Sequence, residues 1–163
     1  MSSFNRRFVL LGLPAGLAAC GFAPAYAPGG AAHNLQGAVL VEAPNSRPGY
    51  LLTRHIEERL GRGERQVYGL SYSITLTEEA VAISRANVNT RYNLLGKVTY
   101  ALRDLRSNAV VLSGQADSFT SYSASGTTVA TQAAQRDAEA RLMVILGDQI
   151  LNRLTAEAGK LPA

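Results

Sequence analysis

The sequence is short of the residues and motifs that carry enzyme chemistry. Its 163 residues include one cysteine, Cys20, and two histidines, His33 and His55, and neither histidine has a second histidine or a cysteine at metal-ligand spacing. A nucleotide-binding glycine loop, a nucleophile elbow and an HExxH motif are all missing. These gaps argue against an enzyme, a metal site and a non-covalent cofactor. His55 is expected to be a partly exposed residue of a helix.

The sequence also lacks a large excess of one sign of charge and a long apolar run. Once the first 19 residues are set aside, 14 basic side chains face 12 acidic ones, which leaves a net charge of about +2. There is no basic block and no aromatic platform, so nucleic acid is not the expected partner. No apolar run after residue 19 approaches the length that spans a bilayer. We therefore expect a body that lies outside the membrane.

The first 19 residues have the layout of a secretory signal peptide. Arg6 and Arg7 precede an apolar segment, residues 8–18, which is too short for a permanent transmembrane helix. The segment ends in Leu17-Ala18-Ala19-Cys20, a pattern that resembles the bacterial lipobox, in which cleavage falls just before the cysteine. The resemblance implies diacylglycerol on the thiol of Cys20 and an acyl chain on its amino group. Two or more lipid chains anchor a protein stably, and no thiol is left for the folded body.

An ordinary signal peptide is the alternative, with cleavage after Ala25 or Ala27 and loss of Cys20. The lipobox is favoured because the only cysteine stands at the one position that lipidation needs. Gly21 follows it, where bacterial sorting commonly uses Asp to hold a lipoprotein at the inner membrane, so we expect the outer membrane. Residues 20–37 are rich in Pro, Gly and Ala and are predicted to be a flexible tether from the lipidated cysteine to a domain over residues 38–160.

The first half of this domain predicts one short strand, one helix and one long strand. Residues 38–41 form a short apolar strand, and residues 50–60 carry an apolar stripe at helical spacing. Residues 68–77 alternate between apolar and polar side chains, which predicts a strand with one buried face. The pair Glu78-Glu79 is expected to interrupt this strand at a turn.

The second half predicts two more long strands and a long helix. Residues 92–102 alternate again, with Gly96 on the apolar face, where it marks a bulge or a close backbone approach. A third long strand follows over 110–122, and a helix over 129–158 closes the chain. Long strands joined by short turns form an antiparallel meander. The predicted fold class is α+β: a two-layer sandwich, with a mostly antiparallel four-stranded sheet and two helices packed on one face.

The order of these elements and three short motifs resemble the LptE family of lipopolysaccharide-assembly lipoproteins. The motifs are Cys20-Gly21-Phe22 after the lipobox, Asn89-Thr90-Arg91-Tyr92 at the start of the middle long strand, and Ile150-Leu151-Asn152-Arg153-Leu154 at the end of the last helix. The resemblance covers nearly all of the chain after the signal peptide. It implies a lipid-anchored protein that plugs the lumen of the outer-membrane barrel LptD, supports the assembly of that barrel and helps lipopolysaccharide reach the outer leaflet.

The resemblance also implies cationic contacts to the phosphates of lipopolysaccharide, since Arg and Lys are the usual phosphate-binding side chains. Arg85 best matches the family's basic residue in the loop before the middle long strand. The family's second basic residue has no counterpart in residues 124–128, and Arg91 and Lys97 on the polar strand face are the candidate substitutes. A solvated surface charge is the plainer explanation for each of the three.

A protein of another class is the alternative function. It would be a stand-alone periplasmic lipoprotein that binds a lipid or another ligand, or that serves a transporter as an accessory. Such a binder needs an apolar cavity, whereas a plug needs a filled core and a polar exterior. The large apolar residues on the strands are matched in number by those on the helices, which predicts a filled core.

Overall fold

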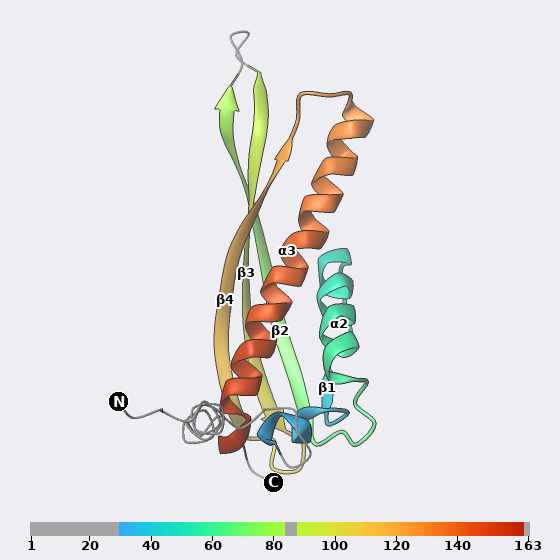
Figure 1. The fold of residues 1–163 in the computed structure, drawn as a ribbon, viewed down its shortest axis with the longest axis vertical. Coiled ribbons are helices and arrows are strands. Elements are labelled where there is room, and N and C mark those ends of the chain that lie inside the picture. Colours follow the sequence, from blue (N-terminus) through green and yellow to red (C-terminus); the bar gives the residue numbers. More distant parts are fainter. Residues whose placement is uncertain (1–29, 84–87, 162–163) are drawn as a thin grey trace, which may run out of the picture.

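The computed structural model describes residues 30–83 and 88–161. A sheet forms one layer and two helices lie along one of its faces, as Figure 1 shows, so the predicted α+β two-layer sandwich is confirmed. The elements are, in chain order, η1 (Ala31–Leu35), β1 (Val39–Val41), α2 (Arg47–Leu60), β2 (Tyr68–Ile83), β3 (Asn89–Asp104), β4 (Val110–Ser123), α3 (Thr128–Glu157) and η2 (Ala158–Lys160).

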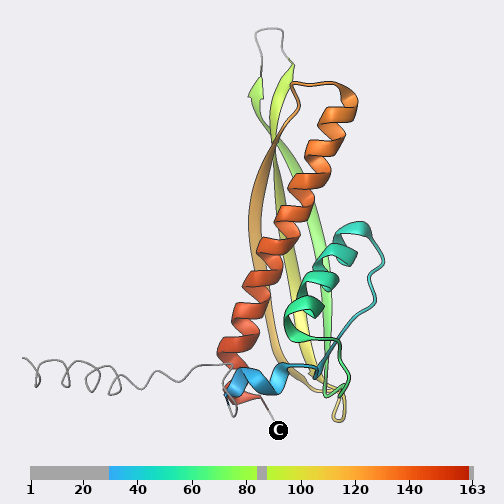
Figure 2. The same cartoon turned by 45° about the vertical axis from the view of Figure 1, so that its right-hand side comes forward.

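The molecule is elongated, and its two ends differ. We call the end with η1 the base, and the end where β2 stops at Ile83 and β3 starts at Asn89 the tip (Figures 1 and 2). Helix α3 runs from the tip to the base, whereas α2 lies beside only its basal half. A strand of 16 residues is roughly 50 Å long and a helix of 30 residues about 45 Å, so α3 matches the long strands in length.

The strands are ordered β1-β2-β3-β4. The short strand β1 pairs parallel to β2, with Val39 opposite Tyr68 and Val41 opposite Leu70. The pairs β2–β3 and β3–β4 are antiparallel. The sheet is therefore mixed but mostly antiparallel, as expected for three strands that follow one another through short turns.

Alternation along the strands separates an inner face, toward the helices, from an outer face. On β3 the inner side chains of Leu94, Val98 and Leu102 are buried, whereas those of Arg91 and Lys97 on the outer face are exposed. The helices fill the space over the inner face with side chains that are completely buried: Leu52 and Ile56 from α2, and Leu142, Met143, Leu146, Ile150 and Leu154 from α3. Full burial of each such side chain contributes about 1.5–3 kcal/mol, so this layer holds the fold together.

Gly96 stands on the inner face of β3, where α3 crosses it. A Cβ at this position would lie 2.9 Å from Cδ2 of Leu142 and 2.9 Å from Cδ1 of Leu146. The close backbone approach predicted at Gly96 is therefore confirmed. The missing side chain lets the two leucines of α3 rest directly on the strand.

Two boundaries differ from the sequence-based expectation. Helix α2 starts at Arg47 rather than at residue 50, because the Ser46 hydroxyl accepts a hydrogen bond from the Gly49 amide (3.2 Å) and Pro48 occupies the first turn, where proline is tolerated. Strand β2 does not turn at Glu78-Glu79 but continues to Ile83, with its irregularity after Ala80.

The packed region also begins earlier than the predicted boundary at residue 38. Within η1, Ala32 is completely buried and Leu35 is 1% exposed, and Leu35 belongs to the main core. His55 is a further correction, since it is 9% exposed instead of partly exposed. Its Nε2 lies 2.8 Å from Oδ1 of Asp148, so a hydrogen bond to α3 holds the ring in the interface between the helices.

Candidate functional site

Of the four residues that the sequence singles out, the structure describes two. Cys20 and Arg85 lie outside the described residues. Arg91 and Lys97 are both exposed on the outer face of β3, as predicted. They are six residues apart on one strand, or roughly 20 Å, so they share a face without forming a single cluster.

Lys97 lies at the centre of a hollow on the outer face. In the paired register it stands between Thr75 of β2 and Asp117 of β4. In a neighbouring pair of the same register, Leu95 of β3 lies opposite Phe119 of β4, and Phe119 is 61% exposed. The hollow measures about 360 Å³, and we call it the outer hollow; its lining is Thr75, Thr77, Glu79, Leu95, Gly96, Lys97, Asp117, Ser118 and Phe119.

The outer hollow places a cation beside exposed apolar side chains. Among the described residues, Lys97 and Arg91 form neither an ion pair nor a hydrogen bond. An ammonium group attracts phosphate as a point charge, while Leu95 and Phe119 offer apolar contact. Chemically, the surface suits an anion that carries hydrocarbon, although Asp117 opposite Lys97 offsets part of the positive charge. The sequence pattern predicts neither apolar member, because Phe119 lies on β4, which alternates irregularly, and Leu95 interrupts the alternation of β3.

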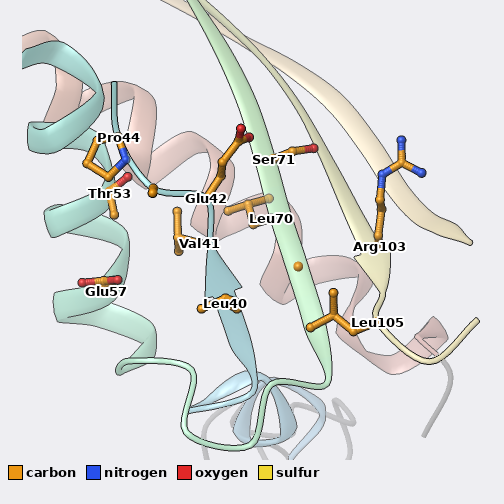
Figure 3. A pocket seen from close by; sticks show the side chains of 12 residues that line it. Leu40, Val41, Glu42, Pro44, Thr53, Glu57, Leu70, Ser71, Arg103 and Leu105 are labelled. Carbon is orange, nitrogen blue, oxygen red and sulfur yellow. The ribbon is translucent and has the colours of Figure 1, made fainter. Parts of the chain in front are cut away.

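A second and larger surface feature is a groove near the base, about 610 Å³ in volume. It lies between the second half of α2, strand β1 and the basal ends of β2 and β3 (Figure 3). Leu40 and Leu105 give it an apolar wall, and Leu105 lies over Gly69, where a Cβ would come within 3.0 Å of the leucine. Arg103 and Glu57 stand at its margins. It is an open surface groove and not a cavity inside the core.

Near the tip, the inner face carries a polar cluster under α3. The carboxylate of Glu78 accepts hydrogen bonds from the Tyr122 hydroxyl (3.1 Å) and from Nε2 of Gln135 (2.5 Å). The ring of Tyr92 stacks on that of Tyr122, with 5.4 Å between the ring centres. Burial, followed by the hydrogen bond to Glu78, raises the pKa of Tyr122 to about 12. The cluster connects β2 and β4 to α3. Because the carboxylate of Glu78 already accepts from two side chains, we assign the cluster a structural role.

The described residues contain no group of three His, Cys, Asp or Glu side chains that is placed to hold a metal ion. None of the helices in the described part of the chain has both the length and the apolar character needed to cross a membrane.

The fold recurs in solved structures of bacterial lipoproteins. A candidate lipoprotein of Caulobacter crescentus CB15 is 27% identical, with a TM-score of 0.65, and the match covers 82% of this chain and 98% of that one. Rare lipoprotein B of Shewanella oneidensis is 11% identical, with a TM-score of 0.57 over 76% of this chain and 96% of that one. A minor lipoprotein of Acinetobacter baumannii is 18% identical, with a TM-score of 0.52 over 76% and 91%. At these identities, the structures from Shewanella oneidensis and Acinetobacter baumannii show a shared fold and nothing more.

No curated protein matches the chain significantly. The family model described as LptE, lipopolysaccharide-assembly, matches residues 37–154, from just before β1 to the last turn of α3. That range includes every strand and both long helices. The resemblance seen in the sequence is thus confirmed, and the chain belongs to the LptE family of lipopolysaccharide-assembly proteins.

Proposed function

We propose that this protein is a non-enzymatic outer-membrane lipoprotein that plugs an LptD-type barrel, supports the assembly of that barrel and assists the passage of lipopolysaccharide to the outer leaflet. Membership of the family supports the pathway. The outer face supports the plug role, because Ser, Thr, Arg and Lys side chains dominate it and the lumen of a porin-type barrel is polar. The filled core over the inner face fits a plug better than a carrier with an internal cavity.

We place the membrane anchor at Cys20. The first described residue, Gly30, directly precedes η1 and so lies at the base of the molecule. Ten extended residues reach at most about 35 Å, so a lipid on Cys20 would keep the base within that distance of the membrane surface. The tip, at the opposite end of the elongated molecule, can then lie far from the membrane surface that holds the anchor.

We assign lipopolysaccharide contact to Lys97 and Arg91, with Arg85 as a third candidate outside the described residues. The single observation that carries the assignment of Lys97 is the outer hollow, where Lys97, which has no ion pair among the described residues, adjoins the exposed Phe119. Arg91 is included because it lies exposed on the same face of β3. Lipopolysaccharide combines phosphate with acyl chains, so a cation next to apolar side chains matches both of its parts.

Affinity purification from the protein's own cell envelope tests the plug proposal. The full chain, tagged at the C-terminus, is extracted in mild detergent, and the proteins that co-purify are identified. We expect a large outer-membrane barrel in stoichiometric amount, and we expect Cys20→Ser to reduce the yield of that complex. Purification alone, or with inner-membrane transporter subunits, would reject the proposal.

Lipopolysaccharide contact is tested with the double variant Arg91→Gln/Lys97→Gln. The matched control is Arg59→Gln/Arg136→Gln, which removes two exposed arginines from the helices instead. Loss of two charge-assisted contacts should weaken lipopolysaccharide binding by roughly tenfold or more, while the control binds as the wild type does. Equal binding by both double variants would remove Arg91 and Lys97 from the site.

The basal groove favours a second candidate function, namely binding of an apolar ligand by the isolated protein. Its wall of Leu40 and Leu105, both exposed, offers the apolar surface that such a ligand needs. If the protein purifies alone, organic extraction and mass spectrometry of the purified protein identify a bound lipid. Substitution of Leu105 by Ser, with the exposed Val129→Ser on α3 as control, then tests whether the lipid occupies this groove.

A further inference from the structure

We propose that a pocket between β3, β4 and the C-terminal part of α3 binds a phosphate group. The pocket measures about 290 Å³ and is lined by Tyr100, Gly114, Gln115, Gln149 and Arg153. None of these side chains is a carboxylate, so Arg153 gives the lining a net positive charge. The inference goes beyond the proposed function and does not depend on it, because the pocket lies beside α3 and is separate from the outer hollow.

The Tyr100 hydroxyl is the first observation that points to a ligand. The residue is only 5% exposed, yet its hydroxyl has no hydrogen-bond partner among the described residues. In that part of the chain, every fully buried side-chain nitrogen or oxygen has a partner, so this hydroxyl must reach the pocket. Tyr72, opposite Tyr100 in the sheet, is different: its hydroxyl lies 2.8 Å from Oγ1 of Thr53 and donates to the Gly49 carbonyl (3.2 Å).

Gly114 allows the Tyr100 ring to reach the pocket. The two residues are paired in register between β3 and β4. A Cβ on residue 114 would lie 2.6 Å from the Tyr100 hydroxyl oxygen and 2.8 Å from Cζ, well inside any normal contact. The ring therefore extends across β4 at the one position without a side chain, and its hydroxyl emerges where α3 packs on that strand.

Arg153 supplies the charge from the opposite layer. It is exposed on α3, and its guanidinium forms no ion pair with any described residue. Burial raises the pKa of Tyr100, and the charge of Arg153 offsets part of that rise. Gln149, one turn earlier, donates from Nε2 to the Asp117 carbonyl (3.2 Å) and so fastens this turn of α3 to β4.

These donors favour phosphate over a carboxylate. Guanidinium groups bind phosphate with two parallel hydrogen bonds, and a tyrosine hydroxyl adds a donor from a different direction. A tetrahedral group with several oxygen atoms accepts from the sheet side and the helix side together, whereas a flat carboxylate has only two oxygens to offer. The phosphate can be free in solution or part of a lipid headgroup, since the chemistry at the pocket is the same.

Calorimetric titration of the full chain in a neutral maltoside detergent tests the inference. The probes are inorganic phosphate and, separately, phosphatidic acid in the same micelles, with diacylglycerol as the lipid without phosphate. Arg153→Gln should weaken phosphate binding by roughly tenfold or more, and Tyr100→Phe by several-fold, since each removes one donor group. The control Arg136→Gln removes an exposed arginine elsewhere on α3 and should bind as the wild type does.

The two probes distinguish the source of the phosphate. Saturable binding of phosphatidic acid but not of diacylglycerol, weakened in both pocket variants, identifies a lipid headgroup. Binding of inorganic phosphate alone, with the same dependence on Arg153 and Tyr100, identifies a soluble ligand. Absence of saturable binding of both probes, or equal affinity in wild type, Arg153→Gln and Tyr100→Phe, would overturn the inference. Since the barrel takes no part in this titration, failure of the plug proposal leaves the result unaffected.

Discussion

Tyr122 shows how one side chain connects the sheet to the helix near the tip. Its hydroxyl donates to Glu78, a carboxylate that also accepts from Gln135 of α3, and its ring stacks on Tyr92. Ionisation of the phenol would place a second negative charge next to Glu78 and remove the donor. The folded protein therefore holds the Tyr122 proton more tightly than the unfolded chain does, with a pKa of about 12.

We expect this proton to make stability fall steeply at high pH. Tyrosine in an unfolded chain has a pKa of about 10, so the contribution of Tyr122 is complete below that pH and is lost as the pH rises toward 12. In urea unfolding followed by circular dichroism at pH 9 and pH 11.5, wild type should lose on the order of 2 kcal/mol more than Tyr122→Phe does. Tyr50→Phe, at a position that is 56% exposed, is the control. Equal losses in wild type and Tyr122→Phe would contradict the assigned role.

At the scale of elements, the contact between α2 and α3 determines where α2 lies. The helices meet at Gly147, where a Cβ would come within 2.7 Å of Cδ2 of His55 and 3.5 Å of Cδ1 of Leu52. The hydrogen bond between His55 and Asp148 lies at this contact, and an ion pair between Arg47 and Glu139 joins the helices nearer the start of α2. The imidazole ring is rigid, so the approach of the helices depends on the missing side chain at residue 147.

Gly147→Val should separate the two helices. Overpacking of this kind costs about 1–3 kcal/mol, and the better helix propensity of Val compared with Gly offsets only a few tenths of that. The matched control is Asn152→Val, at an exposed position of the same helix, where the new side chain meets no packed neighbour. Urea unfolding compares the two variants. A free energy of unfolding for Gly147→Val within about 0.5 kcal/mol of the control would show that α2 tolerates displacement.

The elements that the sequence predicts well are those with a regular local pattern. Alternation placed Lys97 on the outer face and Gly96 on the inner face, because a strand repeats every two residues. Glu78 was assigned to a turn because its partners, Tyr122 and Gln135, are 44 and 57 residues away and leave no local pattern. The start of α2 was missed because Pro48 and Gly49 are also common in turns.

The candidate sites show the same difference between residues that a local pattern predicts and residues that only long-range pairing brings together. Lys97 and Arg91 were found because they sit at outward positions of a regular strand. Phe119 was not, since β4 alternates less cleanly, and it becomes a neighbour of Lys97 only through the register of β3 and β4. The pairing of Tyr100 with Gly114 likewise depends on that register, which is determined by the whole sheet.

Over the whole molecule, the core is concentrated toward the base. There, η1, β1, α2 and α3 all pack with the sheet, whereas toward the tip α3 is the only described helix beside it, and the ends of β2 and β3 extend beyond α3 (Figures 1 and 2). On β2, Tyr68 and Leu70 are buried, but every residue from Ser71 to Ile83 is partly or fully exposed. The tip therefore combines a long pair of strands with little apolar burial, and the helix contacts it partly through the polar cluster around Glu78.

This gradient predicts that the molecule opens locally from the tip. Amide hydrogen exchange of the full chain in neutral detergent should be slowest for residues 69–74 and 98–103, and at least about 100-fold faster for residues 76–83 and 89–93. Strands β2 and β3 pair from base to tip, but the ladder is irregular between Ala80 and Ile83, and β1 pairs with β2 only at residues 68–70. The comparison with Tyr122→Phe therefore isolates the part of the difference that comes from packing. Tyr122→Phe should quicken exchange at the tip and leave the base unchanged, because the hydroxyl contributes only to the tip cluster. Protection that is uniform along β2 and β3 would mean that the sheet opens as one unit and that the covering helices do not govern its local stability.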